Sequence, residues 1–198
     1  MKRYDREYFD RWYRDPRSRM WTRAAIARKV RLAVSVAEYV LERPIRSVLD
    51  VGCGEGTWQP ILRELRPRAR YLGVDSSEYV VRRFGASRNI ILGSLGTLAE
   101  LGLEERFDLV VCCDVMHYVP TGQLVAGLEA MNDLAEGPAY LEAYTSEDPV
   151  EGDEAGFQRR SPRKYRRLLL RAGFVPVGPH CYVTAAIAHT LVALERPG

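Results

Sequence analysis

Cysteine is scarce in this sequence, and its spacing fits neither a disulfide framework nor a zinc site. The four thiols include no Cys-x-x-Cys pair, which is the usual spacing of zinc ligands and redox motifs. Three of the four lie in segments that have the composition of strands or strand ends. We therefore expect reduced and mostly buried thiols at Cys53, Cys112, Cys113 and Cys181.

Long apolar runs are also absent. The apolar stretches are short and are interrupted by Arg, Glu or Gly, so no membrane-spanning helix is predicted. The charged first residues lead into no apolar segment of the kind that a secretory signal needs. We expect a cytoplasmic protein with no membrane partner. Repeats, linkers and low-complexity segments are missing as well, and 198 residues suit one domain.

The net charge is only +3, but the charges are unevenly placed. Residues 1–31 hold eleven Lys and Arg against four Asp and Glu. An acidic stretch comprises Glu142, Glu147, Asp148, Glu151, Asp153 and Glu154, and a basic stretch comprises Arg159, Arg160, Arg163, Lys164, Arg166, Arg167 and Arg171. A basic face can attract nucleic acid, although such clusters are more often solvated helix surface. The acidic segment 147–154 would suit a cationic or amine substrate, unless its acids are simply solvated.

Helical patterns alternate with short apolar strand patterns along most of the chain. The apolar positions between Ile26 and Leu41 form one helical stripe, and we place Arg28, Lys29 and Arg31 on the opposite, solvated side. Strands are predicted at 47–51, 71–75, 89–92, 107–113 and 139–144. Because these strands are apolar on both faces, they indicate a mostly parallel sheet that helices cover on both sides.

The C-terminal part has a different pattern. Ser161 and Pro162 begin a helix that Gly173 ends, and two strand-like runs follow at 174–177 and 186–194 with no helix between them. These runs predict an antiparallel strand pair at one end of the sheet. We expect a single doubly wound α/β domain over residues 1–198, in which N-terminal helices at 1–44 cap a core at 45–198.

A glycine-rich turn follows the first predicted strand. Gly52, Gly54 and Gly56 alternate with other residues in the sequence Val48-Leu49-Asp50-Val51-Gly52-Cys53-Gly54-Glu55-Gly56-Thr57. Glycines suit a ligand that lies against the backbone, because any Cβ would hold it away, and the next helix presents unpaired N–H groups. A dinucleotide site would want Gly or Ala at position 57, where Thr57 stands, so a nicotinamide oxidoreductase is a poor alternative.

A second acid strengthens the case for a nucleoside. Asp75 ends the next strand, 25 residues after Asp50. Adjacent strand ends of a parallel sheet lie about 5 Å apart, so the Asp75 carboxylate can reach both hydroxyls of a ribose placed over the turn. The alternative is that Asp75 only caps the helix that begins near Ser76 and Ser77.

These motifs resemble the class I S-adenosylmethionine-dependent methyltransferases over about residues 45–195. The acid followed by Gly-x-Gly-x-Gly matches the first motif of that family, and the segment 107–119 resembles its fourth strand and the turn after it. Arg171-Ala172-Gly173-Phe174 resembles the family's C-terminal end. The resemblance implies a seven-stranded sheet, S-adenosylmethionine as the cofactor and transfer of its methyl group.

The resemblance also implies which residues hold the cofactor. Asp50 and the turn would serve the methionine end. Family members often have Gly-Asp near the adenine, where this chain has Gly93 and Ser94, and Ser94 is an uncharged partner. The predicted cofactor-binding residues are Asp50, Gly52, Cys53, Gly54, Gly56, Trp58, Asp75, Ser76, Ser94, Leu95 and Cys113. The N-terminal aromatic residues would form a lid over the cofactor, or would simply pack on the sheet.

For a general base, His117 is the leading candidate, because it follows the fourth strand at the ligand-binding edge and has a reference pKa of about 6.5. A purely structural role for this histidine is the alternative. Asp114, Glu142 and Tyr144 lie at the same edge, and His180 is a weaker candidate.

The acceptor is less defined than the cofactor. The Asn/Asp-Pro-Pro-Tyr/Phe sequence that acts on exocyclic base amines is absent, and so is the Pro-Cys of cytosine-C5 enzymes. We therefore expect a small-molecule acceptor that is methylated at O or N. An RNA or tRNA nucleotide and a non-catalytic cofactor-binding module remain as alternatives, in a monomer or a homodimer.

Overall fold

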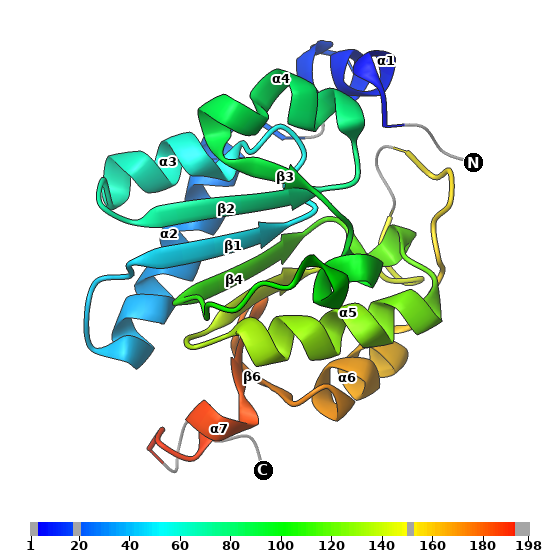
Figure 1. Ribbon diagram of the computed structural model, residues 1–198. Coiled ribbons are helices and arrows are strands. Elements are labelled where there is room, and N and C mark those ends of the chain that lie inside the picture. The colour runs from blue at the N-terminus through cyan, green and yellow to red at the C-terminus, as the bar shows by residue number, and fades with distance from the viewer. Residues whose placement is uncertain (1–3, 18–20, 150–152, 193–198) are drawn as a thin grey trace.

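The computed structural model describes residues 4–17, 21–149 and 153–192. At its centre is a seven-stranded sheet in the order β3-β2-β1-β4-β5-β7-β6 (Figure 1). The strands are β1 (Ser47–Val51), β2 (Arg70–Asp75), β3 (Ile90–Leu92), β4 (Leu109–Cys113), β5 (Ala139–Glu142), β6 (Phe174–Gly178) and β7 (Cys181–Thr184). β1 to β5 are parallel, and β7 is antiparallel to both of its neighbours. The predicted doubly wound, mostly parallel sheet with a C-terminal antiparallel pair is confirmed.

Helices alternate with these strands as the sequence predicts. They are α1 (Arg6–Phe9), the π-helical η1 (Asp10–Arg14), α2 (Arg23–Leu41), α3 (Trp58–Leu65), α4 (Glu78–Arg88), the 3-10 helices η2 (Leu95–Leu101) and η3 (Met116–Tyr118), α5 (Thr121–Leu134), α6 (Pro162–Arg171) and α7 (Ala185–Ala188). Ser77 and Ser161 are the N-caps of α4 and α6, and their side chains accept the Val80 and Lys164 N–H groups. Among the described residues, no helix combines the length and the apolar character needed to cross a bilayer.

The core has two layers because alternate side chains of each strand point to opposite faces. Leu49, Val51 and Val110 pack with α5, η2 and α6 on one face. Val48 and Val111 pack with α2 and α3 on the other. Figure 1 shows α2 and α3 on one side of the sheet and α5 and α6 on the other. This sandwich leaves the carboxyl ends of the central strands at one open edge.

The predicted last strand at 186–194 is wrong. β7 occupies Cys181–Thr184, and α7 begins directly after it. Strand β6 offers backbone partners only as far as the pair Phe174 and Thr184, so a longer β7 would run past its neighbour. Residues 193 and 194 of that prediction lie outside the described residues.

Candidate functional site

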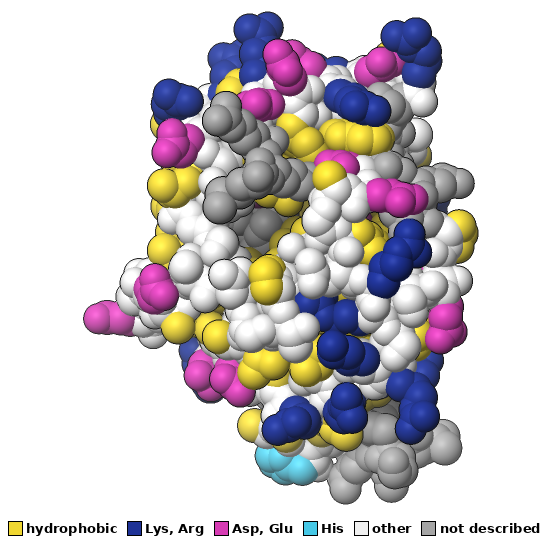
Figure 2. Space-filling view, turned by 90° about the vertical axis from the view of Figure 1, so that its right-hand side faces the viewer, with side chains coloured by type: hydrophobic (Ala, Val, Ile, Leu, Met, Phe, Trp, Pro, Cys, Tyr) yellow, Lys and Arg dark blue, Asp and Glu magenta, His cyan; other side chains and the backbone are white. Residues whose placement is uncertain are grey.

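A cavity of about 360 Å³ lies at the carboxyl ends of the central strands, within the usual size range of small-molecule sites. Its wall combines the glycine turn after β1, the ends of β2 and β4, and the N-terminal segment. Figure 2 looks onto this edge of the molecule, where apolar side chains are visible within a recess. The position agrees with the rule that open α/β sheets bind ligands beyond their carboxyl ends.

The glycine turn requires glycine for two reasons. Gly52, Gly54 and Gly56 have φ values of 73°, 54° and 69°, which L side chains rarely adopt. In addition, a Cβ on Gly52 would lie 2.4 Å from a methyl group of Val115, and one on Gly54 would lie 2.2 Å from the Tyr13 hydroxyl. The sequence predicts glycine here because a ligand lies against the backbone, whereas the close approach that the structure shows comes from the protein's own side chains. Gly52 and Gly54 line the cavity, but Gly56 does not.

Asp75 lines the cavity at the end of β2 and is 8% exposed. Its two carboxylate oxygens accept the backbone N–H groups of Gly54, at 2.8 Å, and Ser77, at 2.9 Å. Burial raises the pKa of this carboxyl, and the two N–H groups oppose that shift. The helix cap itself is the Ser77 side chain. Each Asp75 oxygen therefore keeps acceptor capacity for a ligand hydroxyl, because an ionised carboxylate has about four lone-pair sites.

Asp50 also lines the cavity and is less exposed than Asp75. It is 2% exposed, and its Oδ2 accepts the Tyr71 hydroxyl at 2.8 Å. Burial raises the pKa of Asp50 to about 7, against the lowering effect of that hydrogen bond. The group therefore changes charge near neutral pH.

The other predicted cofactor residues are also gathered here, because the lining includes Cys53, Trp58, Ser76, Ser94, Leu95 and Cys113. Trp58 is only 4% exposed, and its ring packs 5.2 Å from the Tyr140 ring. Ser94 forms a capping box with Thr97 at the start of η2. Both residues thus border the cavity while they hold neighbouring elements in place.

The N-terminal aromatic side chains both line the cavity and pack on the core, so the two interpretations of them are compatible. Tyr4, Tyr8, Phe9, Trp12 and Tyr13 all belong to the lining. Phe9 is 2% exposed and stacks on Tyr79 of α4, with ring centroids 5.7 Å apart. Arg14 fastens the segment to the glycine turn through an ion pair with Glu55 at 2.5 Å.

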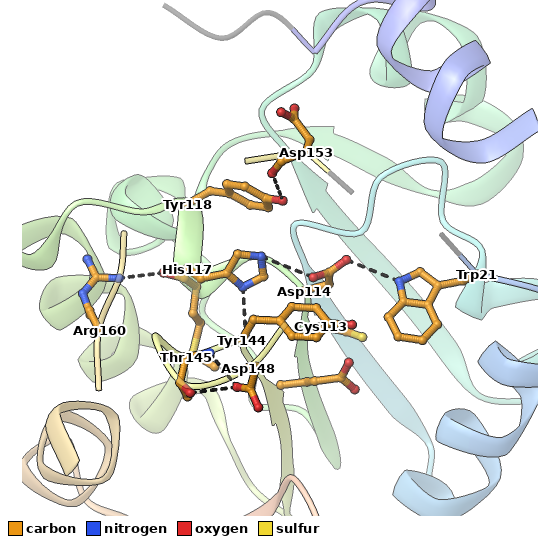
Figure 3. Close-up of polar contacts among 12 residues, drawn as sticks. Trp21, Cys113, Asp114, His117, Tyr118, Tyr144, Thr145, Asp148, Asp153 and Arg160 are labelled. Carbon is orange, nitrogen blue, oxygen red and sulfur yellow. Dashed lines mark hydrogen bonds and ion pairs between the residues drawn. The ribbon is translucent and has the colours of Figure 1, made fainter. Parts of the chain in front are cut away.

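His117 lies behind the cavity wall and not in it. The ring is 1% exposed, and its Nδ1 accepts the Tyr144 N–H at 3.3 Å. Its Nε2 lies 3.3 Å from Oδ1 of Asp114. Asp114 does line the cavity, and its Oδ2 accepts the Trp21 indole N–H at 3.3 Å (Figure 3). Of the two residues, the Asp114 carboxylate is therefore the one that faces the cavity.

Glu142, another predicted catalytic residue, also lies outside the lining. Its oxygens accept Lys29 Nζ and the Tyr140 hydroxyl, each at 2.5 Å. The prediction that Lys29 is solvated is wrong, because its side chain is 15% exposed, lines the cavity and lies 3.4 Å above the Trp21 ring. The sequence did contain a signal that Lys29 faces inward. Lys29 lies four residues before Ala33 of the apolar stripe, so the two residues share a helix face.

The prediction that Arg160 belongs to an exposed basic cluster is wrong, because this residue is 3% exposed and donates to the Met116 carbonyl and to the Thr121 hydroxyl at 3.1 and 3.3 Å. It thereby joins the segment after β5 to η3. His180 lies exposed in the β6–β7 turn, away from the cavity lining. In the acidic segment, Glu147, Asp148 and Glu154 are exposed, and residues 150–152 lie outside the described residues.

Comparisons with known proteins agree with this architecture. A family model described as "Methyltransferase domain" matches residues 49–136. The plantazolicin methyltransferase BpumL, in complex with a pentazolic desmethylPZN analog and SAH, is 14% identical with a TM-score of 0.61, over 82% of this chain and 72% of that one. CalS10, an amino pentose methyltransferase from Micromonospora echinaspora with SAM bound, is 16% identical with a TM-score of 0.63, over 81% and 89% of the two chains.

A third structure widens the chemistry associated with this fold. The cyclase SpnF is 21% identical with a TM-score of 0.55, over 83% of this chain and 62% of that one. No curated protein sequence matches the chain. At these identities, the likeness to solved structures demonstrates the fold.

Proposed function

We propose that the chain is a class I methyltransferase that uses S-adenosylmethionine, and that it transfers the methyl group of this cofactor to a small molecule. One observation carries the proposal: the glycine turn, Asp75 and Asp114 line a single cavity. A cofactor held by the first two would therefore lie beside the third.

The residues around the turn fit this cofactor. The Asp75 oxygens each accept one backbone N–H and retain acceptor capacity toward the cavity, which suits the two ribose hydroxyls. Asp50 offers a carboxyl group for the amino group of the methionine end. When bound, S-adenosylmethionine supplies an electrophilic methyl group on a positively charged sulfur.

The rest of the work falls to alignment and exclusion of water, because the displaced sulfur leaves as a neutral thioether. The aromatic side chains of the N-terminal segment cover the cavity and keep the reacting atoms out of bulk solvent. Tyr13 contributes directly, since its hydroxyl lies against Gly54. Asp114 is placed to receive a proton or to face a positive charge.

A small acceptor suits the charge of the cavity. The charged residues of the described lining are Lys29, Asp50, Asp75 and Asp114, and this excess of carboxylates disfavours a phosphate backbone. The exposed basic side chains of α6 lie elsewhere on the surface, on the lower part of the face in Figure 2. The cavity charge therefore supports a small molecule over a nucleotide of RNA.

Calorimetric titration with S-adenosylhomocysteine, the demethylated product, tests the cofactor site. We expect binding by the wild type and an affinity at least tenfold lower for Asp75→Asn, because the amide has one acceptor oxygen and no charge. Asp148→Asn is the matched control, since Asp148 caps Thr145 outside the cavity lining and should leave the affinity unchanged. Folded wild-type protein that binds neither S-adenosylmethionine nor its product would refute the proposal.

A further inference from the structure

We propose that the methyl acceptor is an amine, and that Asp114 binds its nitrogen as the catalytic carboxylate while His117 positions Asp114. This inference rests on the proposed methyl transfer and names the substrate class of the same site. Four features support it. Three belong to the acceptor end of the cavity, which is the part lined by Trp21, Asp114 and Tyr118: an oriented carboxylate, aromatic faces and a neutralised lysine. The fourth is the charge flow of the reaction.

The first feature is the way in which Asp114 is held. It follows β4 directly and has a φ of 64°, an unusual conformation for a residue other than glycine. Trp21 donates to one carboxylate oxygen, and the His117 ring lies against the other, each at 3.3 Å (Figure 3). Residues from two segments, one before α2 and one in η3, thus contact this carboxylate at the cavity wall.

The second feature is the aromatic surface around it. The cavity lining includes Tyr4, Tyr8, Trp21 and Tyr118. The Tyr4 and Tyr8 rings meet edge to face, with centroids 5.0 Å apart. Burial, with Tyr4 and Tyr118 nearby, raises the pKa of the Tyr8 phenol, so this ring stays neutral. Neutral aromatic faces attract an ammonium group through their quadrupole.

The third feature concerns Lys29, which at first sight argues against a cationic acceptor. Lys29 also lines the cavity and would repel a cation, but its Nζ lies 2.5 Å from Oε1 of Glu142 and 3.4 Å from the Trp21 ring centroid. Glu142 thus balances the lysine charge from behind the wall. Asp114 remains as the carboxylate of the acceptor end, so this end favours a positive charge.

The fourth feature is the direction of charge flow. The bound ammonium first gives one proton to water, which frees the nitrogen lone pair. That lone pair then forms the new N–C bond, the S–C bond pair stays on sulfur, and the positive charge moves from sulfur to nitrogen. Asp114 opposes the charge that develops there, and it or water takes the surplus proton afterwards. A hydroxyl group is a far weaker acid than an ammonium group, so a carboxylate with a reference pKa of about 4 removes its proton much less readily. A carboxylate acceptor would be repelled.

The affinities of two matched probes for the acceptor end test this proposal without relying on turnover. Protein saturated with S-adenosylhomocysteine is titrated calorimetrically with benzylamine and with benzyl alcohol, which have similar size and shape. We expect the wild type to bind the amine at least tenfold more tightly, equivalent to about 1.4 kcal/mol. Asp114→Asn should reduce this ratio below threefold, and asparagine tolerates the positive φ. Asp148→Asn should retain the full ratio.

The outcomes separate the two proposals. Absence of S-adenosylhomocysteine binding would refute the cofactor site. Normal cofactor binding without a preference for the amine, or a preference that survives in Asp114→Asn, would overturn the amine assignment alone. Absence of binding by either probe counts as no preference.

The positioning role of His117 has its own readout. His117→Gln keeps a side-chain N–H for Asp114, whereas His117→Leu removes it. We expect the amine-to-alcohol ratio to be largely retained in the Gln variant and lost in the Leu variant, with cofactor affinity unchanged in both. Equal ratios in the two variants would show that the histidine only fills space.

Discussion

Replacing Asp50 by Asn should change how the stability of the protein depends on pH. The carboxyl group is buried beneath the glycine turn, and burial raises its pKa from 3.8 to about 7. Asn resembles the protonated acid in size, and its carbonyl oxygen can still accept the Tyr71 hydroxyl, which lies 2.8 Å from Asp50 Oδ2. The variant therefore removes the ionisation and keeps the hydrogen bond.

The size of the expected stability change follows from the pKa shift of Asp50. A difference of roughly 3 pH units at about 1.36 kcal/mol each is on the order of 4 kcal/mol. Because the folded-state pKa is the higher one, the folded protein binds the proton more tightly than the unfolded chain. This contribution to stability is fully present below pH 3.8 and is lost as the pH rises to about 7. Above pH 7, the charged and buried Asp50 carboxylate destabilises the wild type.

Urea denaturation of both proteins between pH 4 and 8.5 provides the measurement. The free energy of unfolding of Asp50→Asn minus that of the wild type should rise across pH 4–7 and then level off. Subtraction cancels the groups that titrate equally in both proteins. Asp148→Asn, at an exposed position, should give a nearly flat difference. A flat difference for Asp50→Asn would refute the argument that burial, and not the Tyr71 hydrogen bond, dominates the pKa.

Two further predictions concern the glycine turn and the buried lysine. Gly54→Ala should cost more than the roughly 1–2 kcal/mol of a left-handed alanine, because its Cβ meets the Tyr13 hydroxyl. Gly102→Ala is the control, because Gly102 has a φ of 61° and no atom lies within 4 Å of the new Cβ. It should cost only the roughly 1–2 kcal/mol of the left-handed conformation and leave cofactor affinity intact. Equal losses of stability in the two variants, measured by thermal denaturation, would contradict the clash with Tyr13. Lys29→Met should cost about 3–5 kcal/mol in urea denaturation, because it leaves Glu142 buried and unpaired. Adding Glu142→Gln should recover most of the loss, and a single variant as stable as wild type would contradict the pairing.

Much of the cofactor side of the site was predictable from local sequence. Strand alternation and the glycine spacing place Asp50 at the end region of β1, and Asp75 ends β2. The carboxyl ends of parallel neighbours meet, and the register pairs Val51 with Val74, so the two acids had to lie near one another. The glycines have the positive φ values that such a turn needs.

The side-chain encounters at the acceptor end were not predictable in this way. Sequence placed both His117 and Asp114 at the correct edge, but only packing decided that the histidine lies behind the wall and the carboxylate lines the cavity. Lys29 reaches Glu142 across 113 positions of sequence, and Trp21 reaches Asp114 across 93. Periodicity places a side chain on a face of a helix or strand. The partner it meets there depends on how distant elements pack, and this is why the tertiary structure alone decided the polar contacts of the acceptor site.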